Sequence, residues 1–259
     1  MSTQLHPSPI YGPIHSRRLG LSVGINLMPA DGKYCTFDCI YCECGYNRER
    51  RTHSPRPTCT QVAEALEHTL AEMAQRGQRP DVLTFAGNGE PTAHPHFAEI
   101  VDRVIGLRDR YCPQAHISVL SNATQAHRPE IYRALMRIDN NILKLDTADD
   151  GYIRLVDRPA SPGYRVADVI DSMKRFDGHV IIQTMFLHGT IDGHDVTNTT
   201  ERYVAPWLQA VAEIRPSQVM IYTIDRDTPD RYLQKASPDE LDAICLRVRQ
   251  MGIDCTASY

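Results

Sequence analysis

Three cysteines near the start of this 259-residue chain restrict its chemistry more than any other feature. They lie in the stretch Cys35-Thr-Phe-Asp-Cys39-Ile-Tyr-Cys42, with spacings of three residues and then two. Thiolates this close together can hold one small inorganic centre. A cubane iron–sulfur cluster has four iron corners, so three protein thiolates leave one iron open to a ligand that is not protein. The triplet therefore predicts a metal centre with an open position, as in a catalytic zinc site.

Two other interpretations of the triplet stay open from the sequence. One is a closed zinc site with Cys44 or Cys59 as fourth ligand, and the other is a set of buried free thiols. Residues 1–11 lack the basic start and apolar core of a secretory signal, and no apolar run approaches the roughly 20 residues of a membrane span. We therefore expect a cytoplasmic protein without a membrane partner, in which thiols stay reduced. The cysteines outside the triplet are expected to be small buried side chains: Cys44, Cys59, Cys112, Cys245 and Cys255.

The composition is that of an ordinary globular protein. Hydrophobic residues make up 42% and charged residues 23% of the chain, the net charge is −4, and the pI is near 6.2. Such a chain has no global basic field to attract nucleic acid. Local contacts with an anion or RNA stay open at two groups of arginines, Arg17 with Arg18 and the set Arg48, Arg50, Arg51 and Arg56.

Apolar strands alternate with amphipathic helices along most of the chain. Strands are predicted near residues 23–27, 81–86, 116–121, 141–146, 179–186 and 218–224, and helices near 60–75, 97–110, 129–137, 163–176, 200–214 and 238–251. Such alternation implies parallel strands with right-handed crossovers. Six units are too few for a closed eightfold barrel. We expect an α/β fold, an open partial (β/α)6 TIM-like barrel, as one domain over residues 1–259, with the barrel core at about 19–230 and a C-terminal helix at about 238–251.

Polar residues follow the second and third predicted strands. In a barrel of parallel strands, chemistry collects at the carboxyl ends of the strands. The second strand ends in Gly87-Asn88-Gly89-Glu90-Pro91, where glycines allow close approach of the backbone to a ligand and a carboxylate can bind an ammonium group. The third ends in Ser121-Asn122, which suit a ribose or carboxylate. A helix-entry turn is the alternative for the glycine segment.

The later strands add charged and polar candidates. Lys144 and Asp146 lie two residues apart, hence on one face of the fourth strand. Burying either charge alone is expensive, so an inward-facing charged pair is rarely only structural. The fifth strand offers Gln183 and Met185, although methionine more often fills a core. Residues 188–202 could form a substrate-facing loop or a plain surface loop. Arg226, after the sixth strand, could bind an anion or form a surface salt bridge.

The cysteine triplet, with Tyr41 before its last cysteine, and the Gly-Asn-Gly-Glu run resemble the signatures of radical S-adenosylmethionine (SAM) enzymes. The resemblance covers roughly residues 10–230. The runs Gly-Pro-Ile-His-Ser-Arg-Arg-Leu-Gly, Leu-Asp-Thr-Ala-Asp and Tyr-Thr-Ile-Asp-Arg are most similar to iron–sulfur oxidoreductases related to tRNA wyosine-base synthases.

The resemblance implies a cofactor set and a site. Cys35, Cys39 and Cys42 would hold a [4Fe–4S] cluster whose open iron binds SAM, and Glu90 would hold the methionine amine of SAM. Reduction would cleave SAM to a 5′-deoxyadenosyl radical that abstracts hydrogen from a substrate, with electrons from a donor of the flavodoxin or ferredoxin type. The other positions implied to contact SAM are Tyr41, Gly87, Asn88, Gly89, Ser121, Asn122, Lys144, Asp146 and Gln183.

The substrate stays open among a small molecule, a protein and a tRNA. Wyosine synthases carry further cysteines upstream for a second cluster, whereas this sequence has none before Cys35, and it lacks an overall basic charge. Both departures count against tRNA. A glycyl-radical activating enzyme, which acts on a large protein partner, is the alternative within enzymes. A non-catalytic zinc or iron–sulfur protein would leave Glu90, Asn122 and the Lys144/Asp146 pair without a role.

Overall fold

The computed structural model describes residues 3–16 and 20–259, so Arg17 and Arg18 lie outside the described residues. Its main feature is one eight-stranded sheet in the order β1-β2-β3-β4-β5-β6-β9-β11. All neighbours pair in parallel except β1 and β2, which are antiparallel, and the sheet stays open between its edges β1 and β11. The strands are β1 (Ile10–Ser16), β2 (Gly20–Ile25), β3 (Val82–Phe85), β4 (His116–Ser121), β5 (Asn140–Lys144), β6 (Ile181–Met185), β9 (Gln218–Tyr222) and β11 (Asp254–Ser258). The expected open, partial barrel is confirmed.

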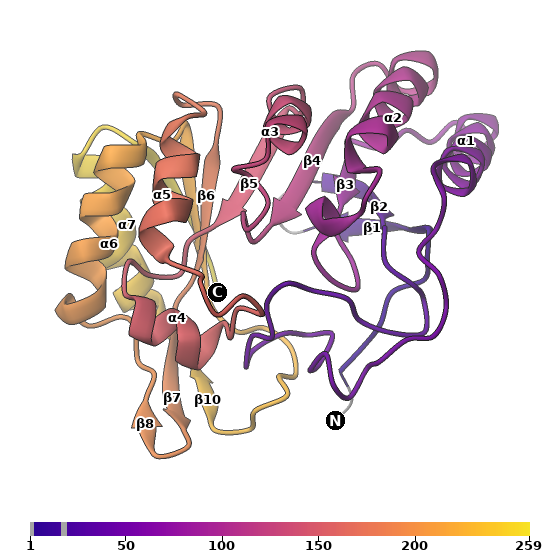
Figure 1. The fold of residues 1–259 in the computed structure, drawn as a ribbon. Helices are drawn as coiled ribbons and strands as arrows, with labels where there is room; N and C mark the ends of the chain where they lie inside the picture. Colours follow the sequence, from indigo (N-terminus) through magenta and orange to yellow (C-terminus); the bar gives the residue numbers. More distant parts are fainter. Residues whose placement is uncertain (1–2, 17–19) are drawn as a thin grey trace.

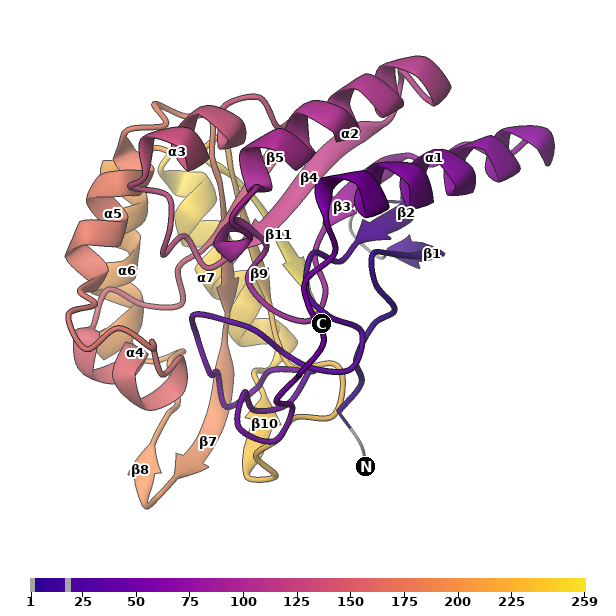
Figure 2. The same cartoon turned by 45° about the vertical axis from the view of Figure 1, so that its right-hand side comes forward.

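Most helices cover the outer face of the sheet (Figures 1 and 2). The helices are α1 (Cys59–Gln75), the 3₁₀ turn η1 (Pro91–Ala93), α2 (Phe97–Tyr111), α3 (Pro129–Leu135), α4 (Asp150–Val156), α5 (Val166–Lys174), α6 (Glu201–Ile214) and α7 (Pro238–Gln250), of which α4 instead packs against the segment around Ile40. Between helices and sheet lies a core in which Phe85, Phe97 and Trp207 are fully buried. Thr58 caps α1 with a reciprocal pair of hydrogen bonds to Gln61. Among the described residues, no helix is long and apolar enough to cross a membrane.

Three parts of the topology differ from the sequence prediction. The chain does not end on α7, because β11 adds a seventh parallel strand beside β9. Its sequence, Asp-Cys-Thr-Ala-Ser, has no apolar run, and the strand forms by backbone pairing around the buried Cys255. The segment expected as a loop at 188–202 contains β7 (Leu187–Ile191) and β8 (His194–Asp195), which form a small sheet with β10 (Leu233–Lys235). The helix predicted over 163–176 is α5, and a further helix that was not predicted, α4, precedes it.

The cysteine loop, residues 26–58, packs against the carboxyl end of β3. The Tyr34 N–H donates to the Asn88 carbonyl over 2.9 Å, and the Glu90 N–H donates to the Tyr34 carbonyl over 3.2 Å. Gly89 has φ of +146°, and a Cβ there would lie 1.8 Å from the Tyr34 oxygen. Only glycine fits such a close backbone approach. The backbone that this glycine admits therefore belongs to the cysteine loop itself.

The substitution Gly89→Ala tests this docking. Backbone strain and overpacking together are expected to lower the free energy of unfolding by about 2–4 kcal/mol, measured by urea denaturation. The matched control is Gly106→Ala, in the middle of α2, where a Cβ meets no atom within 4 Å. That control should be more stable than wild type by about 1 kcal/mol, because alanine favours helix. Equal stability of Gly89→Ala and wild type would contradict the assignment.

Candidate active site

Two sulfurs of the cysteine triplet have a nitrogen donor beside them. The Asn122 amide donates to the Cys35 sulfur over 3.7 Å, and the Lys144 ammonium donates to the Cys39 sulfur over 3.6 Å. Donors of this kind stabilise thiolates, the form in which cysteine binds metal.

The spacing of the three sulfurs fits a cluster better than one metal ion. A tetrahedral zinc ion would hold its thiolates about 3.8 Å apart, given Zn–S bonds of about 2.3 Å. Among the described residues, the sulfurs of Cys35, Cys39 and Cys42 are not a group whose ligand atoms all lie within 4.8 Å of one another. In a cubane each thiolate binds a different iron, which needs the wider spacing. The donor set and its spacing therefore fit a [4Fe–4S] cluster.

The two candidates for a fourth zinc ligand lie in different places. Cys44 hydrogen-bonds to Cys42, and this bond lowers the pKa of the Cys42 thiol. Cys59 instead starts α1, where its sulfur lies within 4.8 Å of ligand atoms of His96 and Glu99. The expectation that all five remaining cysteines are buried is confirmed.

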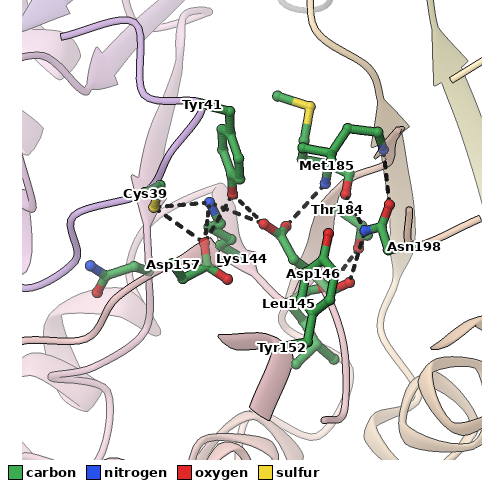
Figure 3. Close-up of polar contacts among 12 residues, drawn as sticks. Cys39, Tyr41, Lys144, Leu145, Asp146, Tyr152, Asp157, Thr184, Met185 and Asn198 are labelled. Atoms are coloured by element: carbon green, nitrogen blue, oxygen red, sulfur yellow. Dashed lines mark hydrogen bonds and ion pairs between the residues drawn. The ribbon is translucent and has the colours of Figure 1, made fainter. Parts of the chain in front are cut away.

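Below Cys39, four side chains from three segments form a buried polar cluster (Figure 3). The Lys144 Nζ lies 3.2 Å from an oxygen of Asp146 and 3.2 Å from an oxygen of Asp157. The Tyr41 hydroxyl donates to both carboxylates, and the ammonium lies 4.1 Å from the centre of its ring. The predicted inward-facing Lys144/Asp146 pair is thus present, and Tyr41 belongs to the same cluster.

Asp157 is the member of this cluster that the sequence did not predict. It ends α4, is fully buried, and its Oδ1 accepts from Cys39 over 3.2 Å and from Tyr41 over 3.1 Å. Its other oxygen, Oδ2, is buried without a hydrogen-bond partner among the described residues. A buried acceptor is costly to leave unpaired, so this oxygen fits a ligand that carries a donor. The only sequence signal was an acidic residue at the end of an unpredicted helix.

Burial controls the protonation of this cluster. Burial alone would lower the pKa of Lys144, but the carboxylates of Asp146 and Asp157 outweigh it and hold the pKa well above its usual value. Burial raises the pKa of Asp146, and Lys144 only partly offsets this. One lysine therefore faces two buried carboxylates, and its charge holds both in place.

A second polar cluster joins the ends of β3 and β4. The Glu90 carboxylate accepts hydrogen bonds from the Ser121 hydroxyl and the Asn122 N–H, both over 2.7 Å. It also accepts from the N–H and hydroxyl of Thr92. Burial raises the pKa of Glu90, while the bonds from Thr92, Asn122 and Ser121 lower it in part. Oε2 accepts a single hydrogen bond among the described residues and has room for a further donor.

Two residues of the glycine segment contact the N-terminal part of the chain. The Asn88 amide donates to the carbonyls of His6 and Pro29, both over 2.9 Å, and accepts from the His6 N–H. Its side chain therefore has no spare donor. Gly87 has φ of +143°, and a Cβ there would lie 2.6 Å from the Asn26 side chain. These positions secure the N-terminal segment against the turn, and Gly87 also lines a cavity.

A cavity of about 380 Å³ adjoins the cysteine loop. Its wall includes Cys42 and Cys44, together with Gln183 of β6, which pairs with Lys144 on the neighbouring strand. Its apolar part is formed by Leu120, Ile142 and Met220 among others. Its size falls in the range of small-molecule sites.

Two further residues that the sequence offered as site candidates have partners within the protein. Arg226 lines the cavity and forms an ion pair with Glu43 over 2.9 Å, in which both side chains are about half exposed. This matches the surface salt bridge weighed from the sequence. Met185 is buried in the core, and its N–H donates to Asp146 over 3.0 Å.

The substitution Lys144→Met tests the buried charge cluster. It leaves two carboxylates without a cation, and we expect a loss of about 3–5 kcal/mol in the free energy of unfolding at neutral pH. Burial already raises the pKa of Asp146, and removing the lysine takes away the charge that partly offsets this, so the loss should shrink as the pH falls and Asp146 becomes protonated. Urea denaturation at several pH values measures this. The exposed Lys174→Met is the control, with an expected change below about 0.5 kcal/mol. A loss independent of pH would contradict the account.

Comparison with known proteins agrees with this geometry. Relatives include a "UPF0026 protein" from Helicobacter pylori, 28% identical over 240 residues that cover 91% of this chain and 72% of that protein. Another, from Methanocaldococcus jannaschii, is 27% identical and covers 90% of this chain and 68% of that protein.

Solved structures show the same fold at low identity. A radical SAM methyltransferase from Sphaerobacter thermophilus superposes with a TM-score of 0.66 at 14% identity, covering 92% of this chain and 66% of that chain. The structure of TYW1 with a lysine-pyruvate adduct bound gives 0.61 at 11% identity, covering 88% and 73%. The family described as the radical SAM superfamily matches residues 31–203, about two thirds of the sequence. This chain therefore belongs to the radical SAM superfamily.

Proposed function

We propose that this chain is a radical SAM enzyme in which Cys35, Cys39 and Cys42 hold the cluster and the adjoining cavity receives SAM and a substrate. Enzymes of the superfamily use a [4Fe–4S] cluster and SAM. When bound, these cofactors supply a 5′-deoxyadenosyl radical, by one-electron cleavage of a carbon–sulfur bond, for hydrogen abstraction. The residues of the chain bind, orient and shield.

One observation carries the proposal. Three sulfurs, two of them beside a nitrogen donor and together spaced too widely for one ion, lie at the carboxyl ends of a parallel sheet, and Cys42 lines a cavity there. A closed zinc site needs neither the cavity nor the wider spacing. The arrangement favours an open cluster whose remaining ligand comes from the cavity.

Two carboxylates are proposed to bind SAM. Glu90 is held by donors from β4, and its Oε2 can accept from the ammonium group of the methionine part. Asp157 has a buried, unpartnered Oδ2 that can accept from a ribose hydroxyl. Ser121 and Asn122 act by positioning, because their polar groups hold Glu90 and the cysteine loop.

Lys144, Asp146 and Tyr41 are proposed to fix the charge under Cys39 rather than to bind SAM directly. The ammonium contacts the Cys39 sulfur and both carboxylates, so it holds the thiolate and its surroundings in one arrangement. Gln183 is the polar group of β6 that remains on the cavity wall for SAM or substrate.

The apolar part of the cavity wall excludes water, which protects a radical from side reactions. A cavity of about 380 Å³ suits a small substrate, or one side group of a larger one. An external one-electron donor, of the flavodoxin or ferredoxin type, completes the proposal.

Cleavage of SAM tests the function directly. The full chain, reconstituted with iron and sulfide without oxygen and reduced with dithionite, should convert SAM to 5′-deoxyadenosine and methionine, measured by chromatography. Cys39→Ala should lose cluster and product, whereas Cys112→Ala, a buried cysteine after α2, should retain both. Zinc instead of iron in the protein, with no product, would refute the enzyme and favour a metal-binding protein.

The substitution Glu90→Gln tests the SAM contact. It keeps the shape of the side chain and removes the charge that would face the ammonium group. We expect SAM affinity at least tenfold weaker, about 1.4 kcal/mol, with unchanged iron content. Equilibrium dialysis under anaerobic conditions measures the affinity. Unchanged affinity in a variant that is folded, as judged by circular dichroism, would assign Glu90 to the turn alone.

A further inference from the structure

The cysteine loop contains a buried lysine that belongs to neither polar cluster of the site. Lys33 lies two residues before Cys35, and its side chain is 1% exposed. The backbone N–H of Lys33 donates to the Arg50 carbonyl over 2.7 Å, so the loop turns back on itself at this residue. The ammonium donates to the Gly45 carbonyl over 2.6 Å. The chain thus encloses a positive charge within the segment that carries the three thiols.

The protein itself compensates this charge only in part. The carboxylate partner of Lys33 is Asp38, at the long distance of 3.5 Å, and the same oxygen accepts from the Asn47 N–H over 2.7 Å. The Asp38 side chain is 26% exposed, so solvent screens it further. A buried ammonium is costly without a close anion.

The cysteine sulfurs become the remaining anionic partners when they bind metal as thiolates. The Gly45 carbonyl that holds the Lys33 ammonium belongs to a turn whose N–H donates to the Cys42 carbonyl over 2.9 Å, so the charge lies at the turn that carries Cys42. Lys144 differs, because two carboxylates at 3.2 Å already balance it. Lys33 is thus the less compensated of the two lysines.

A cluster core with two positive charges on three thiolates has one net negative charge, and reduction by one electron adds a second. A nearby cation stabilises the reduced form more than the oxidised form. Net charge and hydrogen bonds to the sulfurs set the potential of such clusters. We propose that the buried charge of Lys33, at the turn that carries Cys42, raises the reduction potential of the cluster and so makes it reducible by a cellular donor. This inference rests on the proposed function, because it requires the cluster on the cysteine triplet.

Potentiometric titration of the reconstituted full chain, followed by electron paramagnetic resonance, tests the role of Lys33. Lys33→Met removes the charge and keeps most of the side-chain length. At a fixed potential, its ratio of reduced to oxidised cluster should be at least tenfold lower than in wild type, about 59 mV in the midpoint. Lys33→Arg keeps the charge and should stay near the wild-type midpoint. The exposed Lys174→Met controls for loss of a distant positive charge.

A wild-type midpoint in Lys33→Met with full iron content would overturn the inference, as would an equal shift in Lys174→Met. A merely structural lysine would change iron content or stability without moving the potential. If Lys33→Met holds no cluster, the midpoint is measured in Lys33→Gln, which can still donate to the Gly45 carbonyl. A wild-type midpoint in that variant would equally overturn the inference. Wild-type protein without a cluster would refute the proposed function as well, whereas a normal cluster with no shift would refute only this inference.

Discussion

Buried charge beside three thiols is the constraint on which the rest of this structure depends. Lys33 and Lys144 are both almost enclosed: Lys144 contacts the Cys39 sulfur, and Lys33 lies two residues before Cys35. Asp146 and Asp157 balance Lys144 from below, and solvent contributes little, since both carboxylates are almost fully buried. Such charges persist only where partners surround them. The loop can therefore adopt this conformation only where sheet and helix ends supply those partners.

The parallel sheet supplies these partners because the carboxyl ends of its strands meet at one edge. Glu90 lies in the turn after β3, Asn122 follows β4 directly, and Lys144 is the last residue of β5. The cysteine loop is then fixed by backbone bonds to this edge and to α4. The Asp38 N–H donates to the Asp157 carbonyl and the Ile40 N–H to the Val156 carbonyl, both over 2.9 Å. The sulfurs are thus held by rigid elements, as a site for reactive chemistry requires.

The sequence predicted those parts of the site that short-range patterns specify. The cysteine spacing, the position of Glu90 after a strand, and the two-residue spacing of Lys144 and Asp146 are all local signals. Strand–helix alternation gave the open parallel barrel for the same reason. Each of these follows from periodicity or from residues adjacent in the chain.

The features that escaped prediction depend on contacts between distant segments. Lys33 is buried only because the loop turns back to Arg50, and Asp157 enters the site only because α4 packs under the loop. β11 forms by pairing with β9 despite a polar sequence. The glycines of the turn were predicted to admit a ligand, but Gly89 admits the Tyr34 backbone. No local pattern marks such positions.

Electron paramagnetic resonance of the reduced, reconstituted protein, recorded with and without SAM, shows whether the three thiols hold an open cluster. We predict one [4Fe–4S] signal per chain that changes when SAM is added, because one iron is open to the cavity. We also predict that methionine without the adenosyl group leaves a different spectrum from SAM. A signal that SAM does not alter would show a cluster closed by protein ligands, and a single zinc per chain would show no cluster at all. Either result would contradict the account.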